Sequence, residues 1–224
     1  MEQVVRSLDA ATLHTLCSGT GLWDRSLHFA DASRPELLLR SLLVLDSLNF
    51  CFWPRPGLEY DALARGIKRD PDALSCRALE AADALMVQRL MGLDSPPPLA
   101  EERARFLREI PAGLEEFGGS ALALVRSAGG SAAALVGIVT RCFPGFRDEA
   151  VYRGHQVCFY KRAQIFVADV WGAFGGQGAG AFSDIGALTM FADYRVPAQL
   201  RTMGLLEYSP DLARRVRLCE DGRG

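Results

Sequence analysis

The sequence predicts a mainly α-helical protein that forms a single domain over residues 1–224, with a short β-hairpin near residues 150–159. Apolar residues recur at helical spacing along most of the chain. Serine, proline and glycine stand where such helices start and stop. Only residues 150–152 and 156–159 have the composition of paired strands. The length of 224 residues suits one large domain.

The first predicted helix is apolar on most of its surface. Residues 33–36 start it, with a serine, a proline and a glutamate in the order of a capping box. Leucines then recur over residues 37–48, which predicts a buried helix. The prolines at 54 and 56 end the regular helix there, and a more polar helical region follows over residues 59–92.

The remaining helices are predicted from their ends. The glycines at 118 and 119 follow one helix as a C-cap signal, and serines start the next two. The glycine-rich residues 175–180 superficially resemble a dinucleotide-binding loop, but that loop follows a strand. Because residues 175–180 follow a predicted helix, we expect a connector. The expected helices are 99–117, a segment from 120, 131–145, 161–174 and two pieces after 184, the last being 210–218.

Composition and charge exclude several classes of protein. A net charge of −2 gives no general basis for binding nucleic acid, which needs a basic surface. No apolar stretch reaches the roughly 18–20 residues of a membrane span, and the N-terminus lacks a signal-peptide core. We therefore expect a cytoplasmic protein that binds neither nucleic acid nor a membrane. The six cysteines include no Cys-x-x-Cys pair, which predicts reduced core thiols with neither a metal site nor a disulfide. No cofactor is expected.

Three segments combine aromatic and polar residues densely: 46–53, 159–165 and 188–197. An ionisable group inside an apolar run is costly to bury unless it is paired, so such groups form either ion pairs or a working site. The residues alone leave both open, including a structural pair between Lys161 and an acid. The aromatic side chains could equally be plain core.

The same segments resemble a known family. Residues 45–54, 143–148, 160–165 and 189–197, with a shorter run at 117–120, are similar to signature runs of the queuosine salvage protein family, in the family's order. The resemblance spans about residues 4–212. It implies a helical fold related to the helix-hairpin-helix DNA glycosylases. It also implies hydrolysis of the N-glycosidic bond of queuosine 5′-phosphate, a small-molecule substrate, which releases queuine and ribose 5-phosphate for salvage into tRNA.

The resemblance also implies roles for individual residues. Cleavage of a ribosyl C–N bond develops positive charge on the sugar, which a carboxylate stabilises. Asp193 is expected to be this catalytic carboxylate, with a bond to the base as the alternative role. Phe191 is expected to stack on the base, and His28 to line the same pocket. For His28, a capping or surface role remains open.

Cations and pocket walls complete the expected site. Lys161, Arg162 and Arg195 are candidates for the 5′-phosphate, because a dianion favours fixed cations. Asn49 and Trp53 are expected to form the pocket wall. Two alternatives stay open: the arginines could pair with Asp169 or Asp184 to fix helices, and Trp53 could be core.

One part of the family pattern has no counterpart in this sequence. Family members continue into an acid-rich C-terminal helix, whereas this sequence ends in residues 219–224, which lack apolar content to pack. The alternative function is therefore a catalytically impaired homologue that binds queuine or a partner protein. A DNA-repair glycosylase fits less well, because the net charge is negative.

Overall fold

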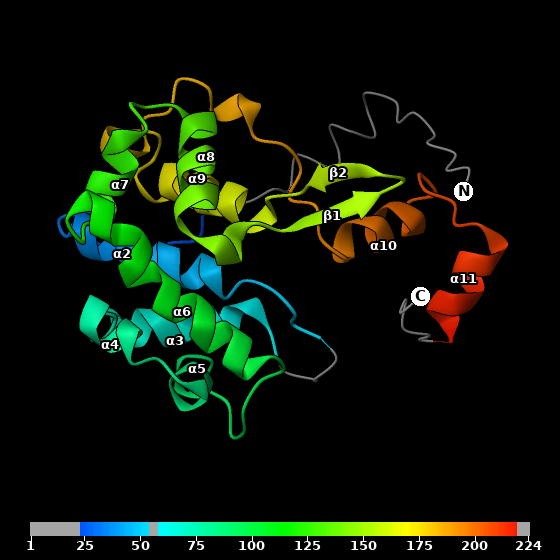
Figure 1. Cartoon of the computed structure of the whole chain (residues 1–224), viewed down its shortest axis with the longest axis horizontal. Helices are drawn as coiled ribbons and strands as arrows, with labels where there is room; N and C mark the ends of the chain where they lie inside the picture. Colours follow the sequence, from blue (N-terminus) through cyan, green and yellow to red (C-terminus); the bar gives the residue numbers. More distant parts are fainter. Residues whose placement is uncertain (1–22, 54–57, 219–224) are drawn as a thin grey trace. The chain divides into compact units, whose positions relative to one another are not determined.

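The computed structural model describes residues 23–53 and 58–218 and confirms a mainly helical protein with one small antiparallel sheet (Figure 1). The chain divides into two compact units, residues 22–191 and residues 192–224 with 1–21. The single domain predicted over 1–224 stays a prediction. Within the described ranges, no helix combines the length and apolarity that a membrane crossing requires.

Helix α2 (Pro35–Ser47) forms the centre of the larger unit, as its leucines predict. Leu38, Leu39, Leu43 and Val44 are completely buried. Four α-helices pack against α2: α3 (Tyr60–Arg69), α6 (Ala100–Leu114), α7 (Ala121–Ser127) and α9 (Lys161–Ala173). Its polar C-terminal end is therefore enclosed by the rest of the unit.

The capping box predicted at residues 33–36 is wrong. Helix α2 has Arg34 at its N-cap, without a side-chain cap bond, and the Ser33 hydroxyl donates to a neighbouring aspartate instead. Glu36 points to the start of α7, where it accepts hydrogen bonds from Ser120 Oγ (2.6 Å) and from the N–H groups of residues 121–122 (3.0 Å each). A carboxylate at a helix start satisfies N–H groups that have no partner inside the helix. Glu36 is therefore a cap for a distant helix.

The polar region 59–92 folds into short helices: α3 (Tyr60–Arg69), η1 (Pro71–Ala73), α4 (Cys76–Glu80) and α5 (Ala84–Leu90). Helices α3 and α5 approach closely at Gly66, where an added Cβ would lie 1.6 Å from the Leu90 carbonyl oxygen. The glycine is therefore required by backbone packing.

Gly66→Ala is expected to lower the free energy of unfolding by about 1–3 kcal/mol, because α3 and α5 must separate to admit the methyl group. The matched control is Gly137→Ala in the interior of α8 (Ala132–Cys142), where an added Cβ meets nothing within 4 Å. This control should stabilise by about 0.5–1 kcal/mol through helix propensity. Urea unfolding of both variants measures the difference, and equal effects would contradict the close approach.

The predicted hairpin is confirmed as β1 (Glu149–Tyr152) and β2 (His155–Cys158). Tyr152 pairs with His155 across a two-residue turn of Arg153 and Gly154, both with positive φ. This is the backbone of a type I′ turn. The strand residues are mostly exposed, so the hairpin lies outside the core. Two 3-10 segments precede the hairpin in the chain: η2 (Glu115–Phe117) follows α6, and η3 (Pro144–Phe146) follows α8.

Residues 175–180 leave α9 as a connector, as predicted. Gly176 N–H donates to the Trp171 carbonyl (2.8 Å), and a Cβ at Gly180 would lie 2.8 Å from the Val170 carbonyl oxygen. The glycines therefore close the end of the helix. The connector ends in the 3-10 turn η4 (Gly178–Gly180), and a second 3-10 turn, η5 (Ile185–Ala187), follows it.

The described part of the smaller unit, residues 192–218, contains α10 (Arg195–Thr202) and α11 (Pro210–Arg217). The four described cysteines are free thiols, as expected, but none is fully buried: Cys76 and Cys142 pack against the core while partly exposed, Cys51 is partly exposed and Cys158 is exposed. An apolar neighbourhood in sequence did not translate into burial, because these residues lie at element ends or on the exposed hairpin.

Candidate functional site

Arg103 of α6 is fully buried and fixes the path of the chain that leaves α2. Its guanidinium donates to the carbonyl oxygens of Leu48 (2.8 Å), Phe50 (2.7 Å) and Cys51 (3.0 Å), and its Nε donates to Pro98 (2.9 Å). Burial lowers its pKa to about 10, so it stays charged at neutral pH. The carbonyl oxygens that follow α2 lie outside a helix, and Arg103 supplies their hydrogen-bond donors.

Arg162, in the first turn of α9, contacts the same segment. It is buried and donates to the carbonyl oxygens of Ser47 (2.6 Å) and Gly145. The Phe50 ring lies against both guanidinium groups, with its centroid 4.3 Å from Arg103 Cζ and 4.7 Å from Arg162 Cζ. Burial lowers the pKa of Arg162 to about 10. These are the contacts of a structural residue, so a phosphate role for Arg162 stays a prediction that the geometry does not favour.

Lys161 and Asn49 meet where α9 begins. Asp148 accepts the Lys161 backbone N–H (3.0 Å) and so caps the helix. The Lys161 ammonium donates to the Asn49 carbonyl (2.9 Å) and lies 3.5 Å from Asn49 Oδ1. Lys161 as a whole is partly exposed. The two predicted site residues are thereby brought together.

Two aspartates inside apolar runs, Asp46 and Asp169, lie near each other, and Asp46 also lies near Lys161. Asp46 of α2 is completely buried, and neither oxygen makes a well-formed hydrogen bond within the described chain. Burial raises its pKa well above the usual range, and the negative charge of Asp169 adds to this. Burial also raises the pKa of Asp169, on α9, to about 7, which the Trp23 indole only partly offsets. Burial therefore favours the protonated form of both carboxyl groups.

His28 is buried next to Tyr60. Its Nδ1 lies 2.7 Å from the Asp24 carbonyl oxygen and its Nε2 lies 2.7 Å from the Tyr60 hydroxyl. The ring stacks on Trp23 at a centroid distance of 4.7 Å. Burial lowers the pKa of His28. The surface role left open for His28 is therefore wrong. We call His28, Asp46, Asn49, Tyr60, Lys161 and Asp169 the α2/α9 cluster.

The predicted aromatic residues are on the surface of the larger unit. Trp53 is 60% exposed, so the alternative of core packing is wrong. Phe191 is 36% exposed. Two residues before it, Thr189 donates to Gln164 Oε1 of α9 through its backbone N–H (2.7 Å) and through its Oγ1 hydroxyl (3.0 Å). Exposed rings of this kind are available to stack on a ligand.

Asp193 and Arg195 belong to the smaller unit. Asp193 Oδ1 accepts the N–H groups of Arg195 (2.8 Å) and Val196 (3.3 Å), which places it at the start of α10. Arg195 is exposed. Asp184, an open alternative partner for the arginines, instead accepts from Ser131 Oγ (2.8 Å) and from the first N–H groups of α8. Asp184 therefore caps α8.

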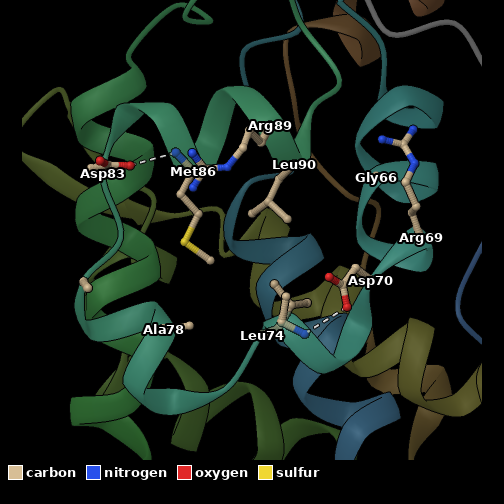
Figure 2. Close-up of a pocket in the computed structure, with 11 residues that line it drawn as sticks. Gly66, Arg69, Asp70, Leu74, Ala78, Asp83, Met86, Arg89 and Leu90 are labelled. Atoms are coloured by element: carbon tan, nitrogen blue, oxygen red, sulfur yellow. Dashed lines mark hydrogen bonds between the residues drawn. The ribbon is translucent and has the colours of Figure 1, made fainter.

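A separate pocket of about 450 Å³ lies between α3, α4 and α5 (Figure 2). Two of its carboxylates cap short helices: Asp70 accepts Ala73 N–H and Asp83 accepts Met86 N–H. Its lining contains none of the residues expected for the site, and so the α2/α9 cluster remains the candidate. The other lining residues include Arg69, Leu74, Arg89 and Leu90.

The structure shows no metal-binding arrangement of three or more histidine, cysteine, aspartate or glutamate residues among those it describes. It also adds residues that the sequence did not single out as site residues. Asp46 and Asp169 carried a signal, since each is a lone charge in an apolar run. Tyr60 and Arg103 carried none, because both stand in polar segments of ordinary composition.

Comparison with known proteins places this geometry in context. A family model described as queuosine salvage protein matches residues 27–221. Over 222 residues, 93% of this chain and 68% of the relative, the chain is 42% identical to a Dictyostelium discoideum protein named queuosine 5′-phosphate N-glycosylase/hydrolase.

Relatives with the same name come from other lineages. One from Sphaerobacter thermophilus is 45% identical over 217 residues, 89% of this chain and 66% of the relative. One from Mus musculus is 39% identical over 201 residues, 81% of this chain and 60% of the relative. The chain spans about two thirds of the length of the curated relatives it matches.

Proposed function

Because the chain belongs to the queuosine salvage protein family, we propose that it hydrolyses the N-glycosidic bond of queuosine 5′-phosphate to queuine and ribose 5-phosphate. The observation that carries this proposal is the identity of 42–45% over about nine tenths of the chain with two proteins named for that activity. The products would supply queuine for tRNA modification in the cytoplasm. A fold related to the helix-hairpin-helix DNA glycosylases and a single domain belong to the same proposal.

In this proposal the substrate is held by groups at both ends. Phe191 stacks on the base and His28 lines its pocket, while Asn49 and Trp53 form the wall. Lys161 binds the 5′-phosphate through its ammonium, which lies beside Asn49 at the start of α9. Arg195 is a second cation for the phosphate. Asp193 stabilises the positive charge that develops on the ribose, and water supplies the hydroxyl group.

Purified protein incubated with queuosine 5′-phosphate should release queuine, measured by chromatography and mass spectrometry. Guanosine 5′-phosphate is the control nucleotide and should stay intact. Binding of queuine by calorimetry without any product would overturn the proposal in favour of a queuine-binding homologue. Absence of both binding and product would also overturn it.

Lys161→Gln is expected to raise KM for queuosine 5′-phosphate by about 10- to 100-fold, the equivalent of one charge-assisted hydrogen bond. KM for the nucleoside queuosine, which has no phosphate, should change little. The matched control is Lys68→Gln, because Lys68 also donates to backbone carbonyls, those of Arg25 and Ser26. Equal losses on nucleotide and nucleoside would assign Lys161 a structural role instead.

A further inference from the structure

Both ring nitrogens of His28 are engaged, which determines where its proton lies. A carbonyl oxygen can only accept, so Nδ1, at 2.7 Å from the Asp24 carbonyl, carries a hydrogen. In the neutral ring Nε2 is then an acceptor, and the Tyr60 hydroxyl at 2.7 Å donates to it. The pair leaves no ring nitrogen of His28 without a partner.

We propose that Tyr60 is a positioning residue that holds His28 in the neutral Nδ1–H form, so that a cationic ligand bound at the α2/α9 cluster meets an uncharged imidazole. The inference rests on the proposed function, because queuine carries a secondary ammonium. An imidazolium next to that ammonium would repel it, whereas a neutral ring does not. A hydrogen bond donated to the basic nitrogen favours the neutral state of a histidine.

Packing keeps the two rings in this arrangement. His28 stacks on Trp23, with an interplanar angle of 18°. Trp23 in turn lies on α9 at Gly172, where an added Cβ would be 2.7 Å from the Trp23 Cβ. The Tyr60 ring packs edge-on against Phe52 at 6.4 Å. The direction of the hydroxyl is therefore set by contacts that do not depend on the hydrogen bond.

Burial favours the neutral state of both residues, and the surrounding charges act differently on each. Around His28, burial is the largest effect and lowers the pKa, Lys68 lowers it further, and Asp24 and Asp61 oppose this. Around Tyr60, burial is the largest effect and raises the pKa, and any negative charge on Asp46, Asp169 or Asp61 raises it further. Tyr60 thus stays protonated and remains available as a donor.

The test is the protonation of His28, followed by nitrogen-15 NMR of labelled full-length protein without substrate. The chain has three histidines, His14, His28 and His155, so His28→Gln and His155→Gln assign the signals. In wild-type protein His28 should be neutral with its proton on Nδ1 at pH 6.5, where an ordinary histidine is about half protonated. In Tyr60→Phe its titration midpoint should rise by about one pH unit.

Tyr160→Phe is the matched control, because the Tyr160 hydroxyl donates to Glu149 on the hairpin (2.8 Å). It should leave the His28 titration unchanged, and thermal unfolding should show that both variants fold. An Nε2–H form of His28, a wild-type midpoint near 6.5, or an unchanged midpoint in Tyr60→Phe would overturn the proposal. These results need no hydrolysis, so they are separable from failure of the proposed function. If the protein hydrolyses queuosine 5′-phosphate and His28 must be neutral for this, the pH below which activity is lost should be higher in Tyr60→Phe than in wild-type protein.

Discussion

Asp193→Asn is expected to lower kcat for hydrolysis of queuosine 5′-phosphate by about 10²- to 10³-fold, because in the mechanism we propose the negative charge of Asp193 stabilises the developing ribosyl cation and asparagine removes it. The fold should survive the change. Oδ1 of Asp193 accepts the N–H groups of Arg195 and Val196 at the start of α10, and asparagine keeps an oxygen acceptor there. The free energy of unfolding should therefore change by less than about 0.5 kcal/mol.

Two variants separate charge from capping. Asp193→Ala removes both, so it should lose activity similarly and also cost about 1 kcal/mol of stability. Asp184→Asn is the matched control, because the Asp184 carboxylate also accepts backbone N–H groups at the start of a helix, α8. This variant should leave kcat unchanged. Release of queuine under saturating substrate gives kcat, and urea unfolding gives stability. Full activity of Asp193→Asn would exclude Asp193 from catalysis.

Arg103→Met is expected to destabilise the protein by about 3–5 kcal/mol. Methionine fills much of the volume but leaves the carbonyl oxygens of Leu48, Phe50, Cys51 and Pro98 without their donor. Each buried acceptor without a partner costs about 1–3 kcal/mol, less where water reaches it. Arg103→Lys should recover only part of the loss, because an ammonium group cannot reach all four oxygens in the geometry of a planar guanidinium.

The control for Arg103→Met is Arg105→Met on the same helix. Arg105 is exposed and pairs with Glu102 and Glu109, and such surface pairs contribute about 0–1 kcal/mol. Denaturant unfolding of the two variants should differ by several kcal/mol. A loss below about 1 kcal/mol in Arg103→Met would show that water replaces the guanidinium and that the segment after α2 does not depend on Arg103.

The sequence predicts elements well where local chemistry decides them. The leucine run gives α2, and the two-residue turn at Arg153 and Gly154 gives the hairpin. Residues 175–180 end α9 as expected. In each case the signal lies within a few residues of the element that it specifies.

Features that depend on distant residues were not predictable in this way. Glu36 looks like the third position of a local capping box, yet its carboxylate binds the start of α7. The site shows the same limit. Lys161 and Asn49 were each recognised from their own segments, but their contact required the fold. Tyr60 gave no signal at all, because its role depends on reaching His28 across 32 positions of sequence.

The caps of α7 and α8 also bear on the order in which the chain can fold. Glu36 precedes Ser120, the N-cap of α7, by 84 positions, so its carboxylate is already available when α7 is synthesised. Asp184 follows Ser131 by 53 positions, so α8 leaves the ribosome before that cap exists. Short helices are marginal without tertiary support. During synthesis, α8 therefore depends on Ser131 alone until the chain beyond α9 has emerged and returned to it.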